Sequence, residues 1–402
     1  MAGVKNYRYS KPSRFSGGTF DDSNPTVANV QKAFSQIAEN GRDMAAGDGE
    51  EIRGRRYTAH IFNSLGFDNH FQGMCRLCNH DYLVVSGGDP HEPMSHLFVI
   101  KMNSGNENGR WRSGNGENTA EEDKIVATIP VDREKWHAGG MSVLGDIVAV
   151  PVYSAKPKYR IFGGKVPINS KVVFYNFAKP EAPEKFPFEL DLPGKKAYAV
   201  ALTNLPDGPF LLGVWCSNDP QITNRDDSRR MDLYISKDTN FENGFADERI
   251  SWFREDIVSN DGQDNEFHDY QNINFVRQAD GKLFLIGMHN TGNFAPTFSK
   301  KDTAGLFEVE LPEIDDMLSN SAGAEITVTK VNRKEFQRNG RQFNMDAAAG
   351  VYVAPTGQLI LYSAFHWLRK RMISFSEFAS KVDSETDDRS GLVAAEMEEI
   401  NQ

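Results

Sequence analysis

Three histidines recur at equivalent places along the chain, and their side chains could do chemistry together. His70, His137 and His268 each open a short polar stretch that runs into strongly apolar sequence. Neutral imidazole binds zinc, iron, copper and nickel well, and it exchanges protons near neutral pH. If the three side chains converge, they predict either a bound divalent metal ion or a pair of groups for acid–base catalysis.

Polar and aromatic neighbours could complete such a site. Asp346 stands at the matching place in a further stretch, so we expect it to join the three histidines as a catalytic group. Alternate residues of a strand share a face, which puts Gln72 on the same face as His70 and Tyr270 on that of His268. The residues expected to bind a ligand are Gln72, Trp136, Tyr198, Tyr270, Gln271 and Asn344.

The elements that must position these residues form a repeat. Five stretches open a unit: HFQGMCRL from 70, HAGGMSVL from 137, KAYAVALT from 196, HDYQNINFV from 268 and FNMDAAAGVYV from 343. Each runs through a turn signal, such as Asp280-Gly281 or Thr356-Gly357, into a second strand of strong β formers. Third strands follow in all five units, whereas clear fourth strands follow only in the first four.

Units of about 60–75 residues with four strands each are typical of a β-propeller, in which the first strand of every blade lines a central channel. We therefore predict a single all-β propeller over residues 57–380, five-bladed, with a sixth blade as the alternative. The fifth unit lacks a fourth strand, and an open sheet edge invites aggregation, so Tyr57–Phe62 is expected to close the ring. An extension over residues 1–50 should hold one helix starting near Asn24, with Val27, Val30, Phe34 and Ile37 on its apolar face, and residues 381–402 should be an acidic tail.

One unit carries a family-like pattern. The stretch KVVFYNFAKPEAPEKFPFELDLPG contains a strand that ends in the turn pattern Asn176-x-x-x-Pro180-x-x-Pro183. It resembles the LVIVD-type propeller repeat. The resemblance covers one of the five units and implies propeller architecture, without assigning any catalytic residue.

The recurring histidines also have a structural explanation. A polar residue at the start of an inner strand can tie one blade to the next through backbone hydrogen bonds. Only three of the five units have the histidine, and no carboxylate recurs with it, which weakens the metal hypothesis. His289 and His366 end second strands and are kept apart from this set, while His91 and His96 are expected in a loop.

Other motifs exclude several classes of site. Cys75 and Cys78 have C-x-x-C spacing, but they lie on an expected strand with no second pair, which favours ordinary core or surface thiols. The chain has no G-x-G-x-x-G or P-loop pattern for a nucleotide, and Ser142 lacks the final glycine of a nucleophile elbow.

The composition argues against two classes of partner, nucleic acids and membranes. The net charge of −11 argues against nucleic acid, and no apolar run is long enough to span a bilayer. Three cysteines and the lack of an apolar leader favour a soluble, cytoplasmic protein. We expect it to bind a small molecule or a glycan in the channel, with histidine acid–base or metal-assisted chemistry. The alternative is a non-catalytic module for a protein partner or a lectin-like role, with the histidines as ties between blades.

Overall fold

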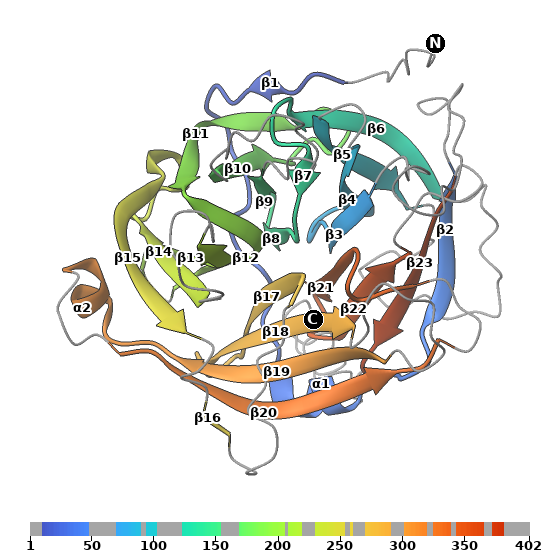
Figure 1. The fold of residues 1–402 in the computed structure, drawn as a ribbon. Coiled ribbons are helices and arrows are strands. Elements are labelled where there is room, and N and C mark those ends of the chain that lie inside the picture. Colours follow the sequence, from blue (N-terminus) through green and yellow to red (C-terminus); the bar gives the residue numbers. More distant parts are fainter. Residues whose placement is uncertain are drawn as a thin grey trace, which may run out of the picture.

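The computed structural model describes thirteen stretches of the chain and places its strands around a central axis (Figure 1). The described residues are 10–47, 70–89, 94–102, 123–153, 169–205, 208–218, 230–253, 258–259, 270–290, 301–319, 325–338, 343–365 and 372–381. Within them, no helix is both long and apolar enough to cross a membrane.

Five blades surround the axis, each built mainly from four antiparallel strands. Blade I contains β3 (His70–Arg76), β4 (Tyr82–Asp89), β5 (Met94–Lys101) and β6 (Asp123–Asp132). Blade II has β7 (His137–Ala138) and β8 (Ser142–Leu144), which both pair with β9 (Ile147–Tyr153), then β10 (Asn169–Asn176), β11 (Glu184–Pro193) and the parallel β1 (Ser13–Arg14).

The remaining three blades follow the same plan. Blade III holds β12 (Lys195–Asn204), β13 (Phe210–Asn218), β14 (Arg230–Ser236) and β15 (Phe245–Phe253), and the 3-10 turn η2 (Phe241–Asn243) precedes β15. Blade IV holds β17 (Asn272–Arg277), β18 (Leu283–Asn290), β19 (Asp302–Glu310) and β20 (Thr327–Phe336), with the short helix α2 (Ile314–Leu318) and the parallel β16 (Val258–Ser259). Blade V holds β21 (Ala349–Val353), β22 (Leu359–Ala364), β23 (Met372–Ala379) and β2 (Arg42–Gly47). The predicted five-bladed, all-β propeller is confirmed.

The core is divided among the seams between blades. Five clusters of buried apolar residues lie one at each seam, for example the cluster of Phe15, Phe174 and Leu212 between blades II and III. Inner and second strands carry apolar residues on both faces because each blade is covered by a neighbour on either side. This explains why the sequence shows continuous apolar runs there rather than strict alternation.

The ring is closed by a strand from the beginning of the chain. Strand β2 pairs antiparallel with β23, from Arg42 opposite Glu377 to Gly47 opposite Met372. It also pairs in parallel with β6 through Ala46 and Gly47, so blades V and I share one sheet. The expected closing segment, Tyr57–Phe62, lies outside the described residues, and the place it was expected to fill is occupied by β2.

The two ends of the ring differ, and we name them by chain direction. At the entry mouth the inner strands begin, and at the exit mouth they end in short turns. The turn glycines Gly145, Gly281 and Gly357 at the exit mouth have φ of +56°, +95° and +76°, which glycine adopts without steric cost. These are the hairpin positions that the sequence indicated.

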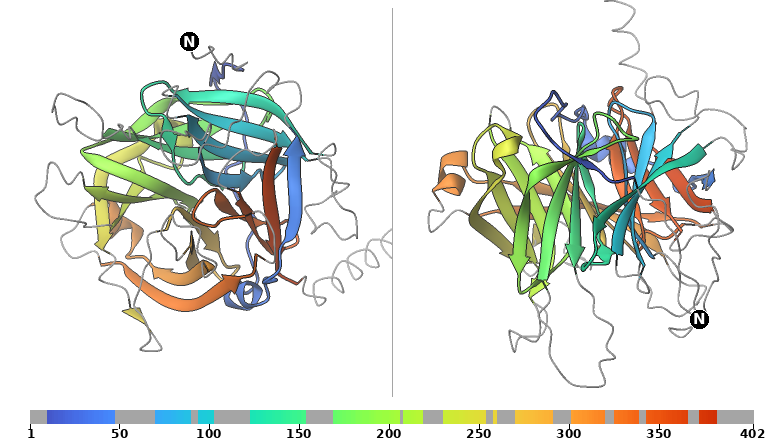
Figure 2. Two further views of the ribbon diagram at one scale, coloured as in Figure 1. Left: turned by 45° about the vertical axis from the view of Figure 1, so that its right-hand side comes forward. Right: turned by 90° about the horizontal axis from the view of Figure 1, so that it is seen from above.

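The N-terminal segment crosses the exit mouth from blade II to blade IV (Figure 2). Asp21 N–H donates to Asp146 Oδ2 at 2.8 Å, and Asn24 Nδ2 donates to the carbonyl of Val143 at 2.9 Å. Farther along, Val27 N–H bonds the carbonyl of Arg277 at 3.0 Å. The propeller is therefore capped at the exit mouth by its own chain.

The N-terminal helix is shorter than predicted. Helix α1 runs over Val30–Ser35, because the side chain of Asn29 caps it by accepting the N–H of Lys32. Val27 forms a bridge with Gln278 instead of a helical turn. Val27, Val30, Phe34 and Ile37 are nevertheless all buried in the seam between blades IV and V, so the apolar face was correct although the helix boundary was not.

Candidate functional site

Antiparallel pairing brings the start of each inner strand beside the end of the second strand. In blade IV, Asn272 pairs with Met288, and Asn290 then pairs with Asp302 of the third strand. His289 therefore lies at the entry mouth, together with the residues before β17. Keeping His289 apart from the inner-strand set was wrong, since alternate strands of a blade run in opposite directions.

His289 faces a carboxylate from the next blade. Its Nδ1 lies 3.9 Å from Oδ1 of Asp346, and the two side chains are 15% and 36% exposed. Asp346 belongs to the turn that leads into β21, where its N–H bonds Oδ1 of Asn344 at 2.9 Å. The pair thus spans the seam between blades IV and V, with partial access to solvent.

A buried aspartate holds that turn in place. Asp302, at the start of β19, is fully buried and accepts the N–H of Met345 at 2.8 Å. It also accepts Nδ2 of Asn290 at 2.9 Å and Nε of Arg338 at 2.5 Å. A carboxylate bonded to three donors is strongly held, so the backbone beside Asp346 is anchored to the strand that follows His289.

A second group of side chains lies at the seam of blades II and III. The imidazole of His137 packs against the ring of Tyr153 at 4.3 Å between centroids, and Trp136 lies edge-on at 5.0 Å. The ammonium of Lys196 sits over the rings of Tyr153 and Tyr198, at 5.0 and 4.7 Å. Such contacts stabilise the cation, and they fix the aromatic faces against one another.

These aromatic residues are mostly buried. His137 is 7% exposed, Tyr153 5% and Tyr198 9%, and the hydroxyl of Tyr198 is 3.0 Å from Oγ of Ser217. Trp136 is half-buried. His137 and the two tyrosines therefore pack in the seam in this structure, and Trp136 is the most accessible of these aromatic rings.

Behind this group, blade III contains a buried ion-pair network. Asp232 accepts Nζ of Lys195 at 2.5 Å, Nε of Arg230 at 2.7 Å and Oγ of Ser251 at 2.7 Å. Burial alone would raise the pKa of Asp232, but the attraction of Lys195, these hydrogen bonds and Arg230 outweigh it and lower that pKa. Asp232 therefore stays ionised at neutral pH.

Close backbone approach forms the floor of the entry mouth. Gly140 exchanges hydrogen bonds with blade III, donating to the carbonyl of Tyr198 and accepting Val200 N–H. A Cβ on Gly140 would lie 2.3 Å from the carbonyl oxygen of Gln271 in blade IV. Asn272 extends the contact by donating Nδ2 to the carbonyl of Ala347 at 3.0 Å. Inner strands of four consecutive blades are thus joined near the axis.

The remaining predicted site residues differ in how deeply they are buried and in whether the structure describes them. Gln72 is buried and its Nε2 donates to the carbonyl of Phe71 at 3.1 Å, while Tyr270 is buried beside Phe307 and His289. Gln271 is half-buried at the floor. His70 begins β3, but its side chain lies outside the described residues, as does the whole of His268. The structure therefore brings together Asp346, Asn344, Tyr270 and Gln271, with His137 near Tyr198 and Trp136.

Two further expectations concern side chains away from this group. His96 lies in strand β5 rather than in a loop, because it is fully buried and packs edge-on against Phe98 at 4.7 Å, whereas His91 falls outside the described residues. Cys75 and Cys78 are buried free thiols. Burial raises the pKa of Cys78 to about 12, so this thiol is protonated at neutral pH, as a core thiol should be.

The metal hypothesis can be tested only on part of its residues. In the portions of the chain that the structure describes, no group of three or more histidine, cysteine, aspartate or glutamate side chains could hold a metal ion. His137, the member of the expected set whose side chain is described, packs against the rings of Trp136 and Tyr153. We derive no chemistry through a metal.

Strand pairing and seam packing define the protein as a five-bladed β-propeller whose exit mouth is crossed by the N-terminal segment. No family model matches the chain, and no curated protein matches its sequence. Solved structures similar to it include an α-L-arabinofuranosidase from Lactobacillus brevis, with a TM-score of 0.41 and 8% identity over 82% of this chain and 96% of the other.

Two others are the polysaccharide lyase Uly1, with a TM-score of 0.30 and 12% identity over 90% of this chain and 97% of the other, and MPT-1, a GDP-Man-dependent mannosyltransferase from Leishmania mexicana, with a TM-score of 0.32 and 10% identity over 79% and 86%. Likenesses this weak carry no argument about function, which rests on the geometry of the entry mouth.

Proposed function

We propose that the protein binds a small molecule or glycan at the entry mouth and that His289 and Asp346 act there as an acid–base pair. The observation that carries the proposal is the 3.9 Å approach of the His289 imidazole to the Asp346 carboxylate in a partly exposed position. A carboxylate near an imidazole stabilises the protonated ring and orients it, which is what a proton-transfer site requires.

The surroundings favour a ligand at this end of the ring. Residues 21–27 cross the exit mouth, whereas Gln271, Asn344 and Trp136, near the entry mouth, are half-buried. Gln271 and Asn344 supply polar groups, and Trp136 supplies a ring that could stack on a sugar. Polar groups with an aromatic face are typical of glycan sites.

The roles of the residues follow from their positions. His289 would exchange a proton with the ligand. Asp346 would orient the imidazole of His289 and stabilise its protonated form. Asp302 acts only as a positioning residue, through its bond to Met345. We keep in the proposal His70, His137 and His268, the three histidines that open repeat units in the sequence, and the proposal that they hold a divalent ion, for which elemental analysis of the purified protein is the test.

The second candidate is a non-catalytic propeller that binds a protein partner or, as a lectin, a glycan. The burial of His137, Tyr198 and Tyr270 in seams favours it, since those residues then serve packing alone. The two candidates differ in what the exposed pair does. Only the first requires His289 and Asp346 for proton transfer.

Calorimetric titration with a panel of neutral and acidic oligosaccharides tests the proposal. We expect saturable binding that Asp346→Asn and His289→Gln each weaken about tenfold, the loss of roughly one charge-assisted hydrogen bond. His80→Gln is the matched control, because His80 pairs with Asp146 at the opposite mouth. Equal losses in the control and the two site variants, or no saccharide binding at all, would contradict the proposal.

A further inference from the structure

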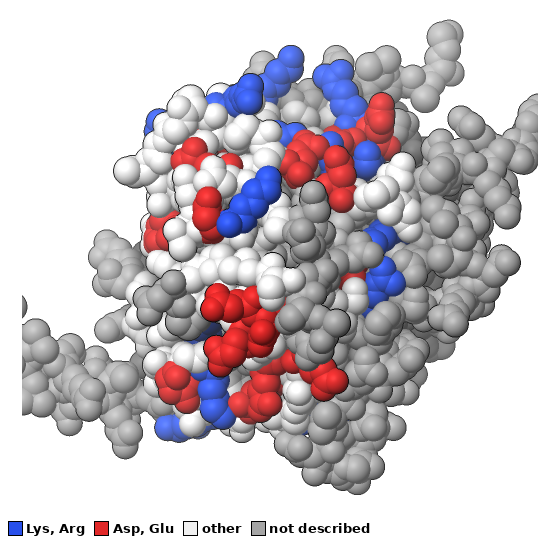
Figure 3. Space-filling view, turned by 90° about the vertical axis from the view of Figure 1, so that its left-hand side faces the viewer, with Lys and Arg blue, Asp and Glu red and all other residues white. Residues whose placement is uncertain are grey.

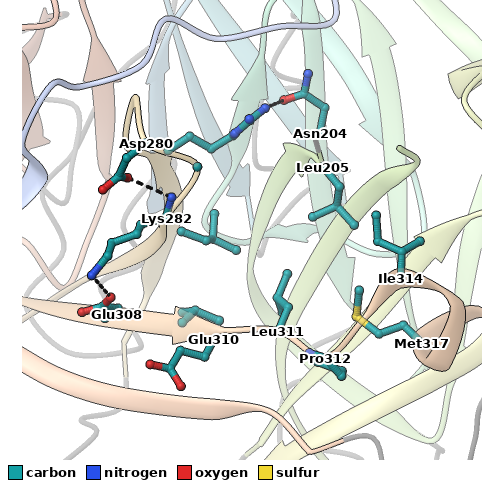
Figure 4. Close-up of a pocket in the computed structure, with 14 residues that line it drawn as sticks. Asn204, Leu205, Asp280, Lys282, Glu308, Glu310, Leu311, Pro312, Ile314 and Met317 are labelled. Carbon is teal, nitrogen blue, oxygen red and sulfur yellow. Dashed lines mark hydrogen bonds and ion pairs between the residues drawn. The ribbon is translucent and has the colours of Figure 1, made fainter. Parts of the chain in front are cut away.

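A pocket that the proposed function does not use opens on the exit side, at the seam of blades III and IV (Figure 4). Its volume is about 540 Å³. Three segments form its walls: the end of β12 at Asn204, the hairpin from Arg277 to Leu283, and the stretch from Glu308 through Met317, which includes most of helix α2. Cavities of this size accommodate one or two large side chains or a small molecule.

One wall of the pocket is apolar. Leu205, Leu311, Ile314 and Met317 point toward one another across it (Figure 4). Leu311 and Ile314 are only half-buried. Leu318, which follows Met317 at the end of α2, is 45% exposed. Partly exposed aliphatic side chains around a hollow are typical of a surface that receives an apolar group from another molecule.

The other wall is charged, and its three carboxylates, Asp280, Glu308 and Glu310, outnumber its two cations, Arg277 and Lys282. The ammonium of Lys282 is neutralised by Oε1 of Glu308 at 2.7 Å, and Nη1 of Arg277 bonds Oδ1 of Asn204 at 3.1 Å. Glu310 also lines the pocket, is exposed, and forms no ion pair with any other residue that the structure describes.

Further carboxylates belong to the helix that forms part of the pocket wall, α2, and to the residue before it. Glu313, Asp315 and Asp316 are exposed on and just before α2. Figure 3 shows Asp and Glu side chains gathered on the side of the molecule that carries this helix. We call Glu310, Glu313, Asp315 and Asp316 the acidic rim. Such a rim attracts cations and repels acidic partners over about one Debye length, roughly 8 Å at physiological salt.

We propose that this pocket binds a basic peptide segment of a partner protein. One apolar side chain of that segment would pack against Leu205, Leu311, Ile314 and Met317, and flanking Lys or Arg side chains would face the acidic rim. An apolar anchor in a pocket, surrounded by complementary charge, is the usual arrangement of an interface hot spot. The charge complementarity selects a basic segment over an acidic or neutral one.

Fluorescence anisotropy with labelled nine-residue peptides tests the proposal. The first peptide has a central Leu flanked by Lys and Gly, the second has Ser in place of Leu, and the third has Glu in place of every Lys. We expect saturable binding of the first peptide only, and at least about tenfold weaker binding of the other two, because each lacks one of the two interactions. Binding should weaken as salt is added.

Two sets of variants locate the binding. Glu310→Gln combined with Asp316→Asn should weaken the first peptide about fivefold, and Ile314→Asp should remove the apolar contact and weaken it further. The matched control is Glu134→Gln combined with Asp191→Asn, two exposed carboxylates on other parts of the ring. Reversing the charge with Glu310→Lys and Asp316→Lys should transfer binding to the peptide that contains Glu.

Several results would overturn the proposal. These are no saturable binding of the first peptide, equal binding of the Leu and Ser peptides, or an equal loss in the control variant. If Ile314→Asp does not fold, as judged by its thermal unfolding, the charge-reversal variant decides alone, because its two positions are exposed. Retained preference for the Lys peptide after charge reversal contradicts the proposal.

Discussion

The two mouths of the propeller use the same pair of residue types in different ways. At the exit mouth, Nε2 of His80 lies 3.3 Å from Oδ1 of Asp146, and at the entry mouth Nδ1 of His289 lies 3.9 Å from Oδ1 of Asp346. The Asp146 side chain is 9% exposed, whereas that of Asp346 is 36% exposed. Residue type alone therefore does not distinguish a structural pair from a candidate site.

The difference lies in what else holds each carboxylate. Oδ2 of Asp146 accepts the N–H of Asp21, so this aspartate fastens the N-terminal segment across the ring. The backbone beside Asp346 is held by Asp302 instead, which leaves the Asp346 carboxylate partly exposed. Active sites commonly combine a backbone held rigidly in place with a functional side chain that is open to solvent. Four predictions test this contrast.

The largest effect is expected from the buried ion pairs behind the entry mouth. Replacing Asp232 by Asn leaves Lys195 and Arg230 buried without their carboxylate, which should cost about 3–5 kcal/mol of unfolding free energy. Because the folded-state pKa of Asp232 is lowered, its stabilisation is present above the unfolded pKa near 4 and is lost as the pH falls through the folded value.

Denaturant unfolding between pH 7 and pH 3 checks both parts of that prediction. The wild type should lose stability on acidification, and Asp232→Asn should show a smaller loss over the same range. Asp191→Asn, at an exposed aspartate on β11, serves as the control and should behave as the wild type. A variant with the stability and pH dependence of the wild type would show that the network contributes nothing.

The second-largest loss of stability is expected at Gly140, where the backbones of neighbouring blades approach closely. A Cβ at Gly140 would lie 2.3 Å from the carbonyl oxygen of Gln271 and 2.8 Å from Oδ1 of Asn272. Gly140→Ala should therefore push blades II and IV apart and cost about 3 kcal/mol, the upper end for an overpacked site. Gly281→Ala is a useful comparison, since it has open space around it and its cost should come only from its positive φ. Chemical denaturation of both variants measures the difference.

The cap at the exit mouth should have an intermediate effect. Asn24 bonds the carbonyl of Val143, the N–H of Gly145 and Sγ of Cys78. Asn24→Ala should cost about 2 kcal/mol, because each lost bond leaves a poorly solvated group. Ligand binding at the entry mouth should not change. A change in saccharide affinity without loss of stability would mean that the two mouths are not independent.

The smallest effects come from the two aspartates themselves, and their contrast is the sharpest test. Asp146→Ala should lower stability by about 1–2 kcal/mol and leave ligand binding intact. Asp346→Ala should change stability by less than about 0.5 kcal/mol and weaken binding by at least about tenfold. Thermal unfolding and calorimetric titration of both variants provide the comparison. The opposite pattern would assign the structural role to the entry mouth.

The sequence predicted the blades well because the information is local. Apolar second strands repeat in every unit and glycine turns such as Asp280-Gly281 in four of the five, and each blade needs only its own strands to be recognised. The closing strand was harder, since β2 is a short stretch, Arg42–Gly47, with one large apolar side chain, Met44. It is a strand because the free edge of β23 requires a partner.

The site was only partly predictable for a related reason. Asp346 and Asn344 stand at inner-strand openings, which the repeat marks clearly. His289 ends a second strand, and the antiparallel direction of second strands was a sufficient signal to place it with Asp346 and Asn344. The burial of His137 against Tyr153 could not be predicted, because it depends on which side chains meet at a seam.

The strand that closes the ring also sets an order of events during synthesis. Arg42 pairs with Glu377 and Gly47 with Met372, so nearly the whole chain must emerge from the ribosome before β2 can find β23. Closing so distant a contact is slow in proteins dominated by non-local pairing. Until then β2 has only its short parallel pairing with β6 of blade I, so its other edge is open, and this interval is when a nascent chain would most need a chaperone.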